Sequence, residues 1–196
     1  GHESDGVRDA YEIETCLGGV DVQIADLIPS IEVENINDSA TADLIRDWVP
    51  DIVIDFGTRK VSAEIINLVP DRIVNLHGGD PRLYRGLDSH MWAMYHGDFS
   101  NLVTTLHTMN PVLDDGEILE VKAIPVFKGM KIHQFRRFNT QVCIEMVLEM
   151  LARLQETGSI QGEAQGQKGR YYSFMPRVLK DIAVRKFERY TERLDG

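Results

Sequence analysis

The sequence predicts an α/β fold: a Rossmann-like, mostly parallel twisted sheet flanked by helices, with a short antiparallel extension and a C-terminal helical tail. Three observations support this prediction. Short apolar runs of strand length alternate with segments of helical period, the connections between them are short, and glycine or proline ends most of them. A length of 196 residues fits one domain, or one domain with an appendage.

The first half of the chain predicts three strands separated by two short helices. Each helix ends at a proline, which cannot continue a helix, and the first helix begins after Asn, Asp and Ser as N-cap candidates. The strands are expected at residues 31–36, 51–57 and 72–79, and the helices at 37–48 and 62–70. Residues 1–30 show no such pattern, and "VDVQIADL" within them fits either a strand or the start of a helix.

The second half predicts a helix, an antiparallel strand pair and a long amphipathic helix. The first helix is expected at 87–97, the two strands at 101–109 and 116–126, and the long helix at 131–155. The glycine-rich stretch 158–176 predicts a surface excursion or a short hairpin. The tail that follows it has helical period again.

The composition limits the classes of function. A formal net charge of −10 argues against a nucleic-acid partner, because phosphate neutralisation needs clustered Lys and Arg. No apolar run approaches the roughly 20 residues that cross a bilayer, so no membrane partner is expected. The start of the chain is polar and acidic, unlike a secretory signal, and the two cysteines lie far apart. These features predict a cytoplasmic protein.

Two polar side chains lie at the end of a predicted strand. Asn75 and His77 are two residues apart, so on a strand they point to the same side, and Gly78 and Gly79 follow them. In parallel sheets, ligands bind outside the carboxyl ends of the strands. We therefore expect this amide and this imidazole at the mouth of a site.

A second group of polar residues follows the strand that carries His107. Asp114 belongs to an Asp-Asp-Gly turn that can bring its carboxylate close to His77. A His can move a proton near neutral pH, an Asp can hold an imidazolium, and an Asn amide can donate to a developing oxyanion. From the residues alone, a plain turn and a hydrogen-bonded core histidine remain open alternatives.

Eight positions carry a resemblance to a known family. They form an Asn-x-His pair, a Gly after a basic loop, a helix with a His that ends in Gly, a strand His and an Asp-x-Gly turn. In this order and spacing they resemble the folate-dependent formyltransferases, in particular the nucleotide-sugar N-formyltransferases. The matched positions are Asn75, His77, Gly86, His90, Gly97, His107, Asp114 and Gly116.

The resemblance covers about residues 31–126 and departs in two places. The family follows its Asn-x-His with Pro-Ser-Leu-Leu-Pro, whereas this chain has a Gly-Gly-Asp-Pro-Arg loop at 78–82. The first 30 residues match the family poorly. The resemblance implies a catalytic domain over 1–155 and an appendage over 156–196, made of the glycine-rich excursion and an amphipathic helix.

The resemblance also implies the chemistry and the residues that perform it. The formyl donor is 10-formyltetrahydrofolate, the acceptor is a primary amine, and no metal is needed. Asn75 and a protonated His77 would stabilise the formyl oxygen, while Asp114 would raise the imidazole pKa and assist proton movement. The expected donor contacts are Phe56, Gly57, Lys60, Val61, Val112 and Leu113. The expected acceptor contacts are Gly78, Asp80, Arg85 and His90.

The resemblance implies a small acceptor and leaves its identity open. A small nucleotide-linked amino sugar is expected, with at most one of Tyr171 and Tyr172 stacking on it, since neighbouring strand residues face opposite sides. Alternatives are glycinamide ribonucleotide as acceptor, a 10-formyltetrahydrofolate hydrolase, and a non-catalytic folate or nucleotide binder. A homodimer is a possible assembly. A metal site made of the three histidines 77, 90 and 107 is disfavoured, because no element carries ligands at metal-binding spacing.

Overall fold

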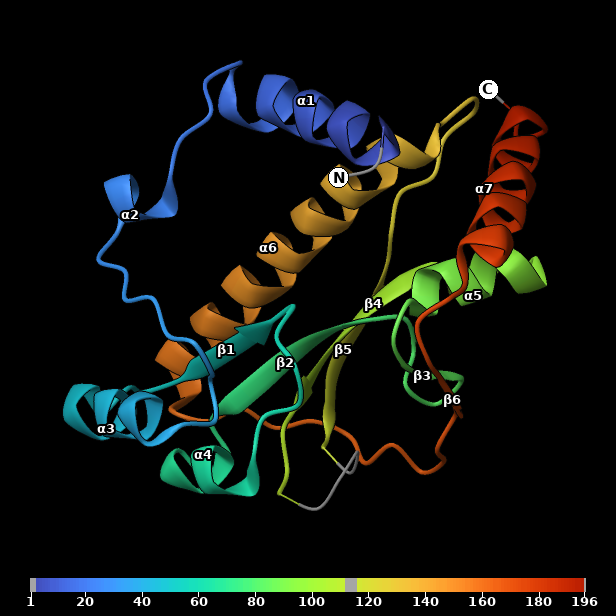
Figure 1. Ribbon diagram of the computed structural model, residues 1–196. Helices are drawn as coiled ribbons and strands as arrows, with labels where there is room; N and C mark the ends of the chain where they lie inside the picture. The colour runs from blue at the N-terminus through green and yellow to red at the C-terminus, as the bar shows by residue number, and fades with distance from the viewer. Residues whose placement is uncertain (1–2, 112–115, 196) are drawn as a thin grey trace.

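The computed structural model describes residues 3–111 and 116–195, and a sheet lies at its centre (Figure 1). Within these residues the sheet has four strands in the order β1-β2-β4-β5. The pair β1–β2 is parallel, and β4 is antiparallel to both of its neighbours, β2 and β5. The strands are β1 Val53–Phe56, β2 Ile73–Gly78, β4 Val103–Thr108 and β5 Ile118–Ala123. A separate parallel pair joins β3 Tyr84–Gly86 to β6 Arg170–Tyr172.

The described helices surround this sheet. Those predicted from the sequence begin and end within a few residues of the expected positions, whereas the 15-residue α1 was not predicted. The helices are α1 Glu3–Leu17, α2 Ile24–Leu27, α3 Ser39–Trp48, α4 Ala63–Leu68, α5 Ser89–His96, α6 Ile132–Thr157 and α7 Arg177–Glu192. A 3-10 turn spans Phe99–Asn101. No described helix combines the length and apolar character that would let it cross a membrane.

The α/β class, the antiparallel extension and the C-terminal helix are confirmed, and one predicted strand is wrong. Residues 31–36 form no strand but an irregular segment, with a bend at Glu34 and a turn that begins at Ile36, which leads into α3. Their apolar alternation predicted a buried face, yet Ile31 and Val33 are 53% and 37% exposed. A strand needs a neighbouring ladder to satisfy its backbone, and no described residue pairs with this segment. The glycine-rich stretch 158–176 makes no hairpin either, since β6 pairs with β3.

Local sequence explains where the helices beside the site begin. Asp38 accepts a hydrogen bond from the Thr41 amide at 2.9 Å, and Ser62 accepts one from the Ile65 amide, so both act as N-caps. Such caps are worth about 1 kcal/mol each. Gly158 adopts a left-handed conformation at the end of α6 with φ of 72°, which is a favourable place for glycine.

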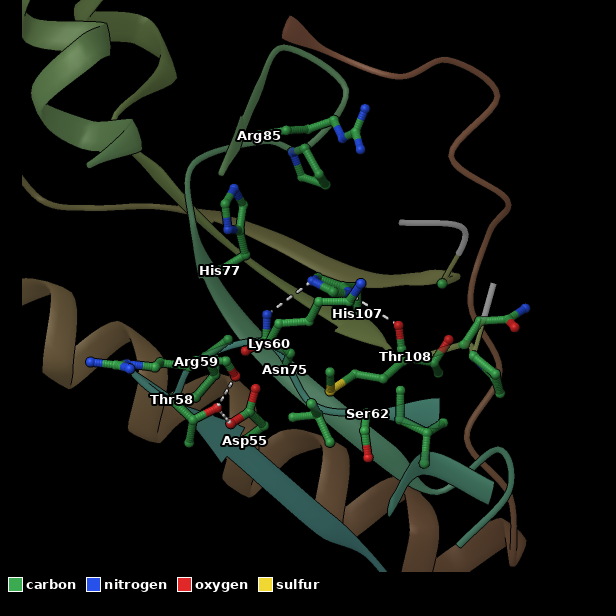
Figure 2. A pocket seen from close by; sticks show the side chains of 18 of the residues that line it. Asp55, Thr58, Arg59, Lys60, Ser62, Asn75, His77, Arg85, His107 and Thr108 are labelled. Atoms are coloured by element: carbon green, nitrogen blue, oxygen red, sulfur yellow. Dashed lines mark hydrogen bonds between the residues drawn. The ribbon is translucent and has the colours of Figure 1, made fainter. Parts of the chain in front are cut away.

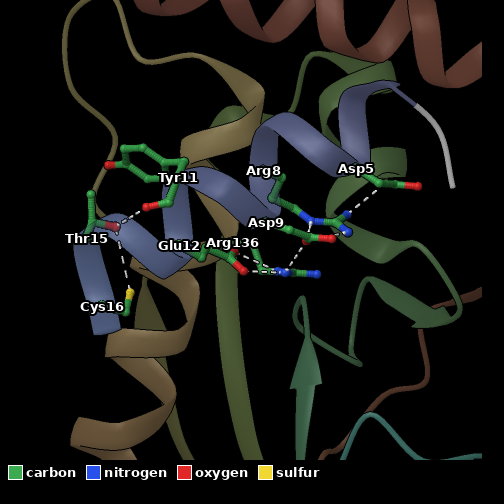
Figure 3. Close-up of polar contacts among 8 residues, drawn as sticks. All are labelled: Asp5, Arg8, Asp9, Tyr11, Glu12, Thr15, Cys16 and Arg136. Carbon is green, nitrogen blue, oxygen red and sulfur yellow. Dashed lines mark hydrogen bonds and ion pairs between the residues drawn. The ribbon is translucent and has the colours of Figure 1, made fainter. Parts of the chain in front are cut away.

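The long helix α6 covers one face of the sheet. Val74 and Leu106 are fully buried against it, where they meet Val142, Met146 and Met150. On the outer side of α6, α1 is held by ion pairs from Arg136 to acidic residues of α1 (Figure 3). Because strand side chains alternate between faces, the neighbours of Val74 and Leu106 point to the opposite face. That face carries the candidate site.

Candidate functional site

A cavity of about 690 Å³ lies on the face of the sheet opposite α6. This volume is in the range that holds small-molecule ligands and cofactors. Its walls come from the loop after β1, the ends of β2 and β4, strand β3 and the segment after α6. The lining includes Asn37, Gly57, Arg59, Lys60, Val61, Asn75, His77, Arg85, Gly86, His107, Thr108, Gly116, Gln165 and Tyr171. Figure 2 shows the labelled side chains from close by.

Asn75 and His107 face each other across the β2–β4 pair and share a hydrogen bond (Figure 2). They are register partners, and Asn75 Nδ2 lies 3.2 Å from His107 Nε2. The other ring nitrogen, Nδ1, lies 2.8 Å from the Thr108 carbonyl, so it carries the proton and donates it. Nε2 of the neutral ring is therefore an acceptor, and the Asn75 amide must turn its NH₂ group toward it.

The pKa of His107 favours this arrangement. Burial lowers the pKa below its usual value of 6.5, the Thr108 carbonyl opposes that shift, and His77 adds to it. A neutral His107 keeps Nε2 as an acceptor near neutral pH. An NH₂ group has two hydrogens, so one hydrogen of Asn75 remains for a ligand oxygen.

His77 is oriented by a backbone carbonyl. Its Nε2 donates to the Tyr84 carbonyl at 2.8 Å, which leaves Nδ1 for a ligand. Burial lowers the pKa of His77, while the Tyr84 carbonyl and Asp80 raise it and Arg85 lowers it further. Among the described residues the net effect lowers the pKa of His77, whereas a rise was expected. The expected rise was attributed to Asp114, which lies outside the described residues.

The loop between β1 and α4 forms the opposite wall. Gly57 has a φ of 69°, and the Thr58 hydroxyl donates to the Asp55 carboxylate. Asn37 fixes the far end, since its amide donates to the Lys60 carbonyl at 2.9 Å and accepts from the Ser62 amide at 2.7 Å. Burial raises the pKa of Asp55, and Thr58 opposes this rise. The loop presents the Lys60 and Arg59 side chains from a fixed backbone.

The structure divides the residues expected at the site into three groups. Those that line the cavity are Gly57, Lys60, Val61, Asn75, His77 and Arg85. Those outside its lining are Phe56, Gly78, Asp80 and His90. The remaining three, Val112, Leu113 and Asp114, lie outside the described residues. Phe56 is 55% exposed on the edge strand, so it does not pack in the core.

His90, Gly78 and Asp80 support the turn that follows β2. His90 Nε2 lies 2.7 Å from the Val103 carbonyl, and burial lowers the pKa of this ring to about 4. A side chain at Gly78 would meet the His90 ring at 2.9 Å, which explains the glycine. Burial alone would raise the pKa of Asp80, but hydrogen bonds from Arg82 Nε to Oδ1 and from Nη2 to Oδ2 hold this pKa below the usual value.

Several lining residues were not expected from the sequence. Asn37 and Arg59 belong to the β1 wall, and Gln165 comes from the segment after α6. Arg59 had a signal, because it precedes Lys60 in the same loop. Gln165 had none, since it lies in a glycine-rich stretch that is typical of surface. Tyr171 lines the cavity, whereas Tyr172 stacks on Tyr84, so the two tyrosines separate as strand alternation requires.

Among residues 3–111 and 116–195, no group of three or more His, Cys, Asp and Glu residues is placed to hold a metal ion.

Comparison with known proteins adds family evidence to this geometry. The family model described as formyl transferase matches residues 22–143. Methionyl-tRNA formyltransferase of Porphyromonas gingivalis is 28% identical over 99 residues, which is 50% of this chain and 30% of that protein. The chain thus spans about a third of the length of the curated relatives it matches.

Solved structures share the fold at low identity. PseJ from Anoxybacillus kamchatkensis, a formyltransferase in complex with UDP-4,6-dideoxy-4-formamido-L-AltNAc and tetrahydrofolate, has a TM-score of 0.60 and 20% identity, covering 89% of this chain and 83% of PseJ. HypX from Aquifex aeolicus with tetrahydrofolic acid has a TM-score of 0.60 and 21% identity, covering 80% and 28%. A sugar N-formyltransferase from Shewanella sp FDAARGOS_354 has a TM-score of 0.59 and 18% identity, covering 95% and 84%.

Proposed function

Because this chain belongs to the formyl transferase family, we propose that it transfers a formyl group from 10-formyltetrahydrofolate to a primary amine. The observation that carries the proposal is the Asn75 amide. It is turned by a neutral His107 so that one N–H remains for a ligand oxygen, next to His77 in a cavity of about 690 Å³. A donor aimed at a developing oxyanion is the main requirement of acyl transfer.

The chain's residues divide the work of the reaction. The amine nitrogen forms a bond to the formyl carbon, the bond from that carbon to folate N10 breaks, and one amine proton ends on N10. Asn75 donates to the formyl oxygen as its charge grows. Neutral His77, whose Nε2 proton is held by Tyr84, accepts the amine proton at Nδ1 and returns it to the leaving nitrogen. Asp114 stabilises the transient imidazolium.

The loop after β1 is assigned to the formyl donor. Gly57 and Val61 shape the wall, and Lys60 with Arg59 offers positive charge to the donor's carboxylates. Phe56, Val112 and Leu113 complete the set of residues assigned to the donor. A fixed loop that presents backbone and cations suits a flat ring system with an anionic tail.

The acceptor assigned here is a nucleotide-linked amino sugar, which would place the protein in surface-polysaccharide synthesis. Two features support it. PseJ, a formyltransferase solved with a UDP-linked formamido sugar, and the Shewanella sugar N-formyltransferase are matched over 83% and 84% of their own length. Tyr171, which is 64% exposed and lines the cavity, offers a ring for stacking. A net charge of −10 disfavours a transfer-RNA acceptor. Arg85 lines the acceptor side, and residues 1–155 act as the catalytic domain with 156–196 as its appendage.

A formyl-transfer assay tests the function directly. Tetrahydrofolate release is followed with a panel of nucleotide-linked amino sugars and with glycinamide ribonucleotide, for the wild-type chain and for Asn75→Ala and His77→Ala. Lys128→Ala, an exposed position outside the cavity, is the control. Amine-dependent release that both site variants lose, and that the control keeps, supports the proposal.

Two other outcomes would replace it. Formate release without any amine would identify a 10-formyltetrahydrofolate hydrolase that uses the same residues. Tight folate binding by the folded wild-type chain without turnover would identify a non-catalytic binder.

A further inference from the structure

The segment after α6 returns to the cavity and is fixed at both ends. Glu163 makes two backbone hydrogen bonds with Ile118 of β5, both 2.8 Å long. A side chain at Gly162 would meet the Ile118 carbonyl at 2.5 Å, and one at Gly169 would overlap the Leu83 backbone. Only glycine permits these two close approaches. In Figure 1 the segment runs from the end of α6 along the lower side of the sheet to β6.

Gln165 lies between these two anchors and reaches across to the strand pair of the site. It is 8% exposed, and its Nε2 donates to the Gly116 carbonyl at 2.8 Å. Gly116 packs directly on β4, since a side chain there would overlap the Thr108 carbonyl and meet His107 Nδ1 at 3.3 Å. Gln165 therefore holds Gly116 beside the Thr108 carbonyl and His107 Nδ1, whose mutual hydrogen bond sets the tautomer of His107.

The side-chain oxygen of Gln165 is buried and unpaired. Among the described residues, Oε1 has no hydrogen-bond partner. If the Gln165 amide were turned by 180°, its Oε1 would face the Gly116 carbonyl oxygen. The hydrogen bond to Gly116 therefore decides the orientation of the amide. The gain from one hydrogen bond is similar in size to the cost of one buried unpaired acceptor. The side chain thus contributes little net stability, and buried unpaired groups call for an explanation other than stability.

We infer that Gln165 is a positioning residue for the proposed formyl transfer, acting through Gly116. It holds Gly116 in place beside His107, and Gly116 is two residues after Asp114 in the sequence. The appendage is then part of the working site. The inference rests on the proposed function, because the effect of Gln165 is expected in turnover.

Two substitutions separate positioning from stability. Gln165→Met keeps the length and removes the donor, and Gln165→Glu replaces the donor by a carboxylate facing a carbonyl. We expect kcat to fall about tenfold or more in both at pH 8, with KM for the donor changed less than threefold and the melting temperature within a few degrees of wild type. Gln161→Met, an exposed glutamine of the same segment, is the matched control and should behave as wild type.

A pH profile gives the sharper readout. A protonated Glu can donate to the Gly116 carbonyl, so the kcat of Gln165→Glu relative to wild type should rise as pH falls from 8 to 6. The Gln165→Met ratio should stay flat. Unchanged kcat in Gln165→Met, or a loss fully explained by a lower melting temperature, would overturn the inference.

Amide exchange distinguishes its failure from failure of the proposed function. The Glu117 amide, which donates to Thr108 at 2.8 Å, should exchange faster in Gln165→Met, with or without turnover. A wild-type chain without formyl transfer would refute the proposed function. Active wild type with unchanged exchange and kcat in the variant would refute only the role of Gln165.

Discussion

The two walls of the cavity hold their functional groups in different ways. On the β2–β4 wall, Asn75 and His107 are fixed by each other, His107 is also fixed by the Thr108 carbonyl, and both are partly buried. On the β1–α4 wall, Arg59 and Lys60 are exposed side chains on a loop whose backbone alone is fixed. The difference indicates that the strand wall sets atom positions for chemistry, whereas the loop wall supplies charge, for which position matters less. Substitutions on the two walls should therefore change different kinetic constants.

The largest effect is expected at Asn75. Asn75→Ala removes a donor to the formyl oxygen, so kcat should fall about 10²- to 10³-fold with little change in KM, since the contact strengthens only in the transition state. Steady-state kinetics with saturating amine measure this. Asn75→Asp keeps the size of the side chain but removes the donor. Near wild-type kcat in either variant would exclude the role of Asn75 in stabilising the oxyanion.

The contact of the buried His90 ring with the Val103 carbonyl of β4 can be tested through the pH dependence of stability. Its pKa is about 4 in the fold against 6.5 as the ordinary value, so between these values the unfolded chain binds a proton that the folded chain does not. Stability from this ring is complete above pH 6.5, is lost as pH falls toward 4, and then levels off. The loss is at most roughly 3 kcal/mol.

Urea unfolding of wild type and His90→Gln at pH 7, 5.5 and 4 measures this loss. The glutamine side chain of the variant cannot titrate but can donate to the Val103 carbonyl, so the variant's unfolding free energy should fall less between pH 7 and 4 than that of wild type. If the unfolding free energies of the two proteins fell equally between pH 7 and 4, the His90 ring would not resist protonation in the folded protein.

His107 tests whether the chemistry of the strand wall depends on orientation. His107→Leu removes the acceptor that turns the Asn75 amide, so kcat should fall about tenfold, while His107→Gln, which offers an amide oxygen, should lose less. The double variant with Asn75→Ala should cost no more than Asn75→Ala alone, because His107 acts through that amide. Additive losses would assign His107 an independent role.

Sequence periodicity predicted the parts of the fold whose partners are local, and the family pattern predicted the strand wall. Asn75 and His77 line the cavity as alternation on a strand requires. His90 belongs to the same family pattern, yet whether a helix His faces a cavity or a packed turn depends on tertiary contacts. The strand expected at 31–36 failed because alternation describes a face without supplying a neighbouring strand. The role of Gln165 could not be predicted from the sequence, because its partner Gly116 is 49 residues away along the chain.

Lys60 carries the smallest expected effect and tests the loop wall. In Figure 2 its side chain projects across Asn75 and His107, whereas Arg59 extends away from them. Lys60→Ala should raise KM for the folate donor about three- to tenfold with kcat nearly unchanged, because an exposed charge contributes about 1 kcal/mol to binding. The increase should shrink at high salt, where exposed charges are screened. Lys128→Ala changes the net charge equally outside the cavity and should leave KM alone. A fall in kcat instead would mean that this wall, too, sets the position of the reacting atoms.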